Sequence, residues 1–128
     1  MLVVFDAPGD LLSMNGKKNM ASRKLEQAWR DAAYWAYCAT FPGVGPSGRV
    51  MPPCIVHTLL PTKVDRGRDP ANFQATVKRI VDGITRAGAW PDDTPDWVDQ
   101  RNPKFYRDES PRQQVIIRLE PRPEGLEQ

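Results

Sequence analysis

The sequence contains very few side chains of the kinds that bind soft metals or form catalytic triads: one histidine, His57, and two cysteines, Cys38 and Cys54. A single histidine excludes metal sites built from two histidines, and any Ser-His-Asp or Cys-His site would have to use His57. His57 alternates with apolar residues in CIVHTLL, which is more typical of a structural strand residue. The cysteines have apolar neighbours and no metal-ligand spacing, so we expect buried free thiols rather than a disulfide or a metal site.

The sequence also lacks a long apolar run. No stretch approaches the roughly 18 apolar residues that would indicate a membrane-spanning helix, and the first residues, MLVVFDAPGD, become acidic too soon for a signal peptide. We therefore expect a cytoplasmic protein with no membrane partner. A length of 128 residues, with 40% hydrophobic and 27% charged residues, predicts one soluble globular domain. We place this domain at residues 1–120, followed by a disordered Pro-rich tail at 121–128.

Hydrophobic patterns predict a strand at 2–5, a helix at 22–39 and a strand at 54–60. A second helix should start near Pro70, and short strands should follow at 97–100 and 104–107, with a clear last strand at 114–120. This order predicts a mixed α/β (α+β) fold, with one small mixed sheet and two main helices on a face. Small domains bury a limited share of their surface, so a homodimer is a natural expectation.

The segment at 66–93, RGRDPANFQATVKRIVDGITRAGAWPDD, carries the most information. Asp69 before Pro70 is a strong helix start, because the carboxylate can cap free N–H groups and proline suits the first helical position. An apolar helix face should follow, formed by Val77, Ile80, Val81 and Ile84. Ala87-Gly88 supplies a stop, and Asp92-Asp93 lies beyond it. Acidic residues therefore flank one helix.

The distribution of charge is more informative than the net charge of +2. Residues 16–30 contain five basic residues and one acidic residue, and residues 61–88 contain six basic and three acidic residues. Residues 89–100 contain four aspartates and no basic residue. Basic groups that hold phosphates beside carboxylates that hold a hard cation are what a metal-dependent nuclease needs. Ordinary solvated faces are the alternative explanation.

These residues resemble the signature of the RusA family of Holliday-junction resolvases, in the divergent form found in phages and prophages of actinobacteria. The matching elements are Arg68-Asp69-Pro70-Ala71-Asn72, Lys78 with Asp82, Ala87-Gly88 and Trp90-Pro91-Asp92-Asp93. The resemblance implies a compact α/β homodimer that binds four-way DNA junctions in the bacterial cytoplasm during recombination and repair. It also implies an endodeoxyribonuclease that resolves the junction by paired nicks with Mg²⁺, or Mn²⁺, and no small-molecule cofactor.

By the same resemblance, Asp69 and Asp93 would be the first metal ligands, Asp92 a helper, and Lys78 the residue that contacts the scissile phosphate. The expected DNA-binding residues are Asn15, Lys17, Lys18, Arg66, Arg68 and Asn72. Each assignment has a simpler alternative: Asp69 as a helix cap, Asp92-Asp93 as a turn, and Lys78–Asp82 as a surface ion pair. Ala71 stands where the family has a second acidic residue, so a protein that binds branched DNA without cutting it is the main alternative function.

Overall fold

The computed structural model describes residues 1–14, 18–43, 50–63 and 69–122, and contains strands and helices in the predicted order. The elements are β1 (Leu2–Asp6), α1 (Met20–Thr40), β2 (Cys54–Thr62), the 3₁₀ helix η1 (Pro70–Phe73), α2 (Gln74–Arg86), β3 (Val98–Gln100), β4 (Lys104–Arg107) and β5 (Gln114–Pro121). Each predicted strand and helix is therefore present, with ends that shift by a few residues.

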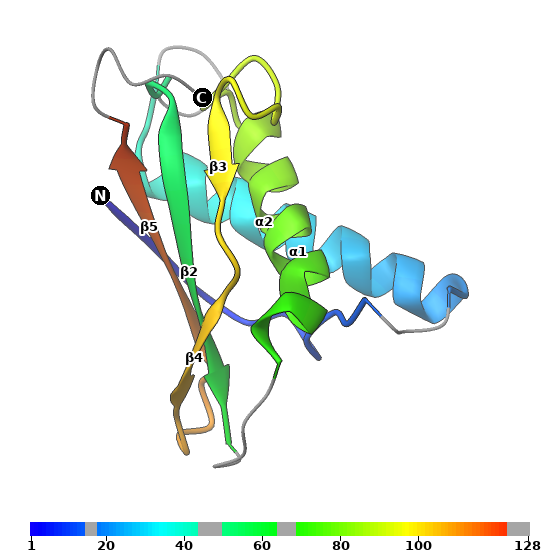
Figure 1. The fold of residues 1–128 in the computed structure, drawn as a ribbon. Coiled ribbons are helices and arrows are strands. Elements are labelled where there is room, and N and C mark those ends of the chain that lie inside the picture. Colours follow the sequence, from blue (N-terminus) through cyan, green and yellow to red (C-terminus); the bar gives the residue numbers. More distant parts are fainter. Residues whose placement is uncertain (15–17, 44–49, 64–68, 123–128) are drawn as a thin grey trace.

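The strands form one mixed sheet in the order β1-β5-β2-β3, and β4 pairs with β2 farther along the same edge. β5 lies between β1 and β2 and is antiparallel to both. β3 and β4 run parallel to β2. Figure 1 shows both helices on one side of this sheet. The predicted mixed α+β fold is confirmed.

The core lies between that side of the sheet and the two helices. Alternate residues of the strands point into it: Val56 and Leu60 from β2, and Val115, Ile117 and Leu119 from β5 are fully buried. The four apolar residues that the helical period predicted for α2, Val77, Ile80, Val81 and Ile84, are also fully buried. From α1 the buried residues are Trp29, Ala33 and Tyr37. Periodicity thus identified the inward face of α2 correctly.

The start of the second helix differs from the prediction. Asp69 does act as a cap, since its carboxylate accepts a hydrogen bond from the Ala71 N–H at 3.1 Å, but it caps the short 3₁₀ helix η1. The regular helix begins only at Gln74. Phe73 packs edge-on against Phe105 of β4, with 5.4 Å between ring centroids, so a long-range aromatic contact holds the turn before α2. The predicted stop is confirmed, because Gly88 adopts a φ of 101°.

The two helices approach most closely at Gly83. A Cβ atom at this position would lie 2.2 Å from the carbonyl oxygen of Arg30 and 3.1 Å from the Cβ of Ala33. Beside this contact, the Arg30 Nε donates to the Asp82 carboxylate at 2.7 Å. Glycine is therefore required where α1 and α2 cross, and an ion pair fixes the crossing at its edge.

The first two residues of the predicted disordered tail are folded, and the rest of that tail, 123–128, lies outside the described residues. β5 continues to Pro121, and Arg122 donates its backbone N–H to the Pro53 carbonyl at 2.9 Å, so both residues belong to the folded domain. Cys38 and Cys54 are free thiols, as predicted; Cys54 is buried and Cys38 is half-buried. Across the described segments, no helix is both long enough and apolar enough to cross a membrane.

Candidate functional site

Lys78 and Asp93 line the same hollow at the edge of the sheet. The hollow measures about 610 Å³ and is bounded by α2, the loop after it, β3 and the end of β5; its lining residues are Lys78, Asp93, Pro95, Val98, Asp99, Gln100 and Arg122. Two of the three residues expected to be catalytic are therefore brought together by the fold. Asp99 also touches the hollow, but its carboxylate accepts a hydrogen bond from Arg101 at 3.0 Å.

Lys78 is available to a ligand because the ion pair considered for it does not form. Asp82, one turn later on α2, turns toward α1 instead, where it pairs with Arg30 at 2.7 Å and lies 3.8 Å from Arg79. The alternative in which Lys78 and Asp82 form a surface pair is therefore wrong. Lys78 is exposed, and its ammonium group makes no hydrogen bond or ion pair with the residues that the structure describes.

The loop that carries Asp92 and Asp93 is held from both ends. The Asp92 Oδ1 accepts hydrogen bonds from the Thr94 N–H at 3.0 Å and from the Thr94 hydroxyl at 2.6 Å. These bonds lower the pKa of the Asp92 carboxyl, because they stabilise its charged form. Both bonds use Oδ1, so Oδ2 remains the more accessible oxygen of this carboxylate.

Arg122 fixes the same loop from the end of β5. Its guanidinium donates to the Pro95 carbonyl at 2.9 Å and to the Asp96 carbonyl at 2.5 Å. Sequence reasoning missed Arg122, because it placed this residue in the disordered tail. The only signal that could have found it was the length of the last strand, which local patterning defines poorly at its ends.

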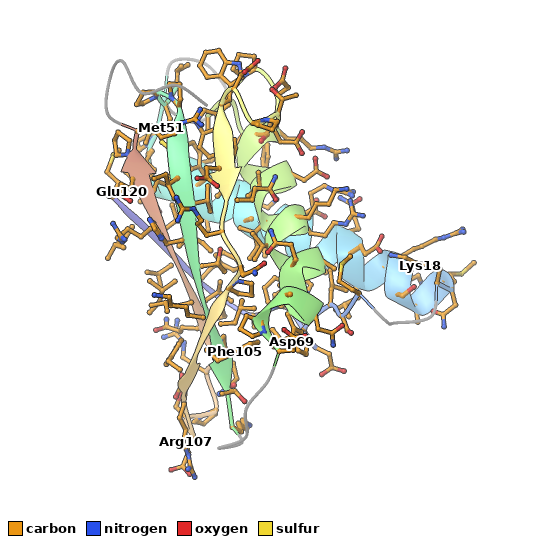
Figure 2. All side chains as sticks on the ribbon, in the orientation of Figure 1. Lys18, Met51, Asp69, Phe105, Arg107 and Glu120 are labelled. Carbon is orange, nitrogen blue, oxygen red and sulfur yellow. The ribbon has the colours of Figure 1, made fainter. Side chains whose placement is uncertain are left out.

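Asp69 lies at the opposite end of α2 from Asp93. The helix contains 13 residues and therefore spans about 20 Å; Asp69 precedes it, near the lower end in Figure 2, and Asp93 follows it. Among the described residues, Asp69, Asp92 and Asp93 do not come together in one group that could hold a metal ion. A site that uses all three could form only between two copies of the chain.

The fit to Mg²⁺ thus depends on Asp92 and Asp93. In the described ranges, no group of three or more His, Cys, Asp or Glu side chains is arranged to hold a metal. Mg²⁺ nevertheless keeps most of its water ligands and is commonly bound through only one or two carboxylates. The half-buried Asp93 and the exposed Asp92 meet this lower requirement.

Only two of the six expected DNA-binding residues, Lys18 and Asn72, lie within the described segments. Lys18 lies at the end of α1 that extends beyond the sheet (Figure 2), where it is 68% exposed and pairs with Glu26. Asn72 lies in η1 at the other end of α2 from Asp93, and its carbonyl accepts the Met14 N–H at 2.7 Å. Asn15, Lys17, Arg66 and Arg68 fall outside the described residues.

No protein-family model and no curated protein matches this chain. The site itself must therefore support any assignment of function.

Proposed function

We propose that this protein is an endodeoxyribonuclease that cleaves four-way DNA junctions, as its resemblance to the RusA family implies. The observation that carries the proposal is the shared hollow of Lys78 and Asp93. An unpaired ammonium group beside a carboxylate at an open edge of the sheet provides one group for a phosphate and one for a cation. Among the predicted site residues that the structure describes, no other oppositely charged pair lines one hollow.

The residues of the hollow have distinct roles in this proposal. Lys78 binds the scissile phosphodiester and stabilises the charge that develops on its oxygens. Asp93, with Asp92, would hold Mg²⁺, which when bound supplies charge neutralisation and an activated water. Arg122 keeps the loop that follows Asp93 in place beside the hollow.

The N-terminal part of α1 adds a surface for the DNA backbone. Lys18 lies just before α1, Arg23 and Lys24 lie near its start, and all three are exposed. Such basic side chains supply sequence-independent affinity that falls with salt. We further propose that the protein acts as a homodimer in the bacterial cytoplasm, since paired nicks in opposing strands require two sites related by two-fold symmetry.

Binding of branched DNA without cleavage is the second candidate. The observation in its favour is that, among the described residues, Asp69, Asp92 and Asp93 do not form one metal-binding group, which leaves Asp93 with the neighbouring Asp92 to assist it. A site with few carboxylates binds Mg²⁺ weakly. Both candidates predict junction binding with a steep salt dependence, and only the first predicts cleavage.

The deciding experiment is cleavage of a labelled synthetic four-way junction with Mg²⁺ and with EDTA. We expect symmetric nicks that require Mg²⁺, that disappear in Asp93→Asn and that fall by at least about tenfold in Lys78→Met. Arg86→Met is the matched control for Lys78, because Arg86 is exposed on the same helix and outside the hollow. A junction that is retarded but uncut in every lane would establish the binding protein instead.

Asp69→Asn tests whether two chains share a site. Asparagine is as good a helix cap as aspartate, so this variant should keep its fold. If Asp69 is only a cap, cleavage should persist. If cleavage is lost, mixing Asp69→Asn with Asp93→Asn protein should restore part of it, because one site of each mixed dimer would then contain both wild-type carboxylates.

A further inference from the structure

The side of the sheet that faces away from the helices carries a second hollow, which the proposed nuclease does not use. The register brings Val4, Ile116, Leu59 and Lys104 into one row across β1, β5, β2 and β4. The adjacent row contains Leu2, Arg118 and His57. An apolar row thus runs beside a basic row, on a face that no described helix covers (Figure 1).

The hollow on this face measures about 460 Å³ and combines two kinds of surface. Leu2, Leu59 and Ile116 form an aliphatic floor, and Arg101, Lys104 and Arg118 supply three permanent positive charges. No carboxylate lies among the lining residues. A volume of this size falls in the range of small-molecule sites, which are typically apolar with a few charged groups that orient the ligand.

The cations of this hollow are only partly neutralised by their neighbours. Arg101 pairs with Asp99 at 3.0 Å, and Arg118 lies 3.9 Å from Glu120, which His57 also engages at 2.8 Å. Lys104 has no ion pair with the residues that the structure describes, and it ends the apolar row. The positive charge therefore lies along one side of the aliphatic surface, at Arg118, and at one end of it, at Lys104.

This arrangement selects the class of ligand. Inorganic phosphate alone would leave the aliphatic floor in contact with water, and a neutral apolar molecule would desolvate the cations without compensation. A ligand that satisfies both surfaces has an anionic end and a flat or apolar body. The amide of Asn102, also in the lining, could meet the polar edge of that body.

We propose that the open face of the sheet binds a nucleoside phosphate, either a free nucleotide or one unit of a nucleic-acid strand. Its phosphate contacts Lys104 and the two arginines, and its sugar and base cover Leu59 and Ile116. This site lies across the sheet from the helix that carries Lys78, and it does not depend on the proposed nuclease activity.

The test is calorimetric titration of the Asp93→Asn protein in EDTA, so that cleavage plays no part. The probes are deoxyadenosine monophosphate, deoxyadenosine, inorganic phosphate and a short single-stranded oligodeoxynucleotide. We expect the monophosphate to bind more tightly than deoxyadenosine or phosphate, since each of these lacks one half of the recognised structure. If the oligodeoxynucleotide binds much more tightly than the monophosphate, the ligand is one unit of a nucleic-acid strand. If the monophosphate binds more tightly, the ligand is a free nucleotide.

Variants assign the binding to this face. Lys104→Met should weaken monophosphate binding about tenfold, the effect of losing one charge-assisted contact. Ile116→Thr should also weaken it, because this change makes the aliphatic floor of the hollow more polar. Arg112→Met is the control, because Arg112 is exposed and pairs with Asp6 outside the hollow. Equal binding of all probes, or an unchanged affinity in Lys104→Met, would overturn the proposal. The proposal would also be overturned if the monophosphate did not bind and Ile116→Thr converted a dimer into monomers. That result would show that a second copy of the chain covers this face.

Discussion

Replacing Gly83 with alanine should destabilise the protein, although alanine is normally the better helix residue. The added Cβ would lie 2.2 Å from the Arg30 carbonyl oxygen, and that atom is part of the backbone of α1. A carbon and a carbonyl oxygen in ordinary contact are about 3.3 Å apart. The two helices would therefore have to separate by roughly 1 Å, since no side chain can rotate away to relieve the contact.

The size of the effect follows from two opposing terms. Overpacking a well-packed contact costs about 1–3 kcal/mol, and a rigid backbone neighbour favours the upper end of that range. The gain in helix propensity from glycine to alanine is about 1 kcal/mol. We therefore expect the free energy of unfolding to fall by about 2 kcal/mol.

Urea unfolding followed by tryptophan fluorescence measures this loss, because Trp29 is fully buried beside the crossing. Arg86→Ala is the control; it adds an alanine to the same helix at an exposed position and should change stability by less than about 0.5 kcal/mol. A Gly83→Ala protein as stable as the wild type would refute the reasoning. Junction cleavage should fall as well, since a displaced α2 moves Lys78 relative to Asp93.

Three further predictions concern single groups. Thr58→Val should raise the free energy of unfolding, measured by urea unfolding, by about 1 kcal/mol. The reason is that the buried Thr58 hydroxyl has no hydrogen-bond partner among the described residues; a less stable variant would contradict this. Thr94→Val removes the hydroxyl but keeps the backbone N–H, so it should move the pKa of Asp92 part of the way up toward its ordinary value of 3.8 in an NMR titration. The stability that this carboxylate contributes above pH 3.8, and that is lost as the pH falls through its lowered pKa, should shrink accordingly; an unchanged pKa would show that the Thr94 hydroxyl is not a cause. A thiol reagent should modify the half-buried Cys38 in the native protein and Cys54 only on unfolding, since burial raises the pKa of the Cys54 thiol; equal rates would refute it.

Most of the fold was predictable because its elements are defined by local patterns. The buried positions of α2 repeat with the helical period, and the strands at 54–60 and 114–120 alternate or consist largely of β-branched residues. The start of α2 was not predictable in the same way. Asp69-Pro70 is a genuine cap signal, but the aromatic contact between Phe73 and Phe105 joins residues far apart in the sequence and decides where the regular helix begins.

The candidate site shows the same division between local and distant contacts. Lys78 and Asp93 were found through the resemblance and lie together, whereas the suggested ion pair of Lys78 with Asp82 failed. Spacing of four residues permits that pair, but Arg30 from α1 offers Asp82 a closer and less exposed partner. Arg122 could not be recognised, because its role depends on where β5 ends relative to a loop about 26 residues earlier.

The geometry of α2 explains why the predicted carboxylates behave differently. Lys78 and Asp82 are four residues apart and so lie on the same side of α2, but Lys78 lines the hollow whereas Asp82 pairs with Arg30 of α1. Asp69 precedes α2 and Asp93 follows it, and within the described segments these two residues do not join Asp92 in one metal-binding group. We therefore expect the proposed nuclease either to operate with Asp92 and Asp93 alone or to complete its site with Asp69 of a second copy.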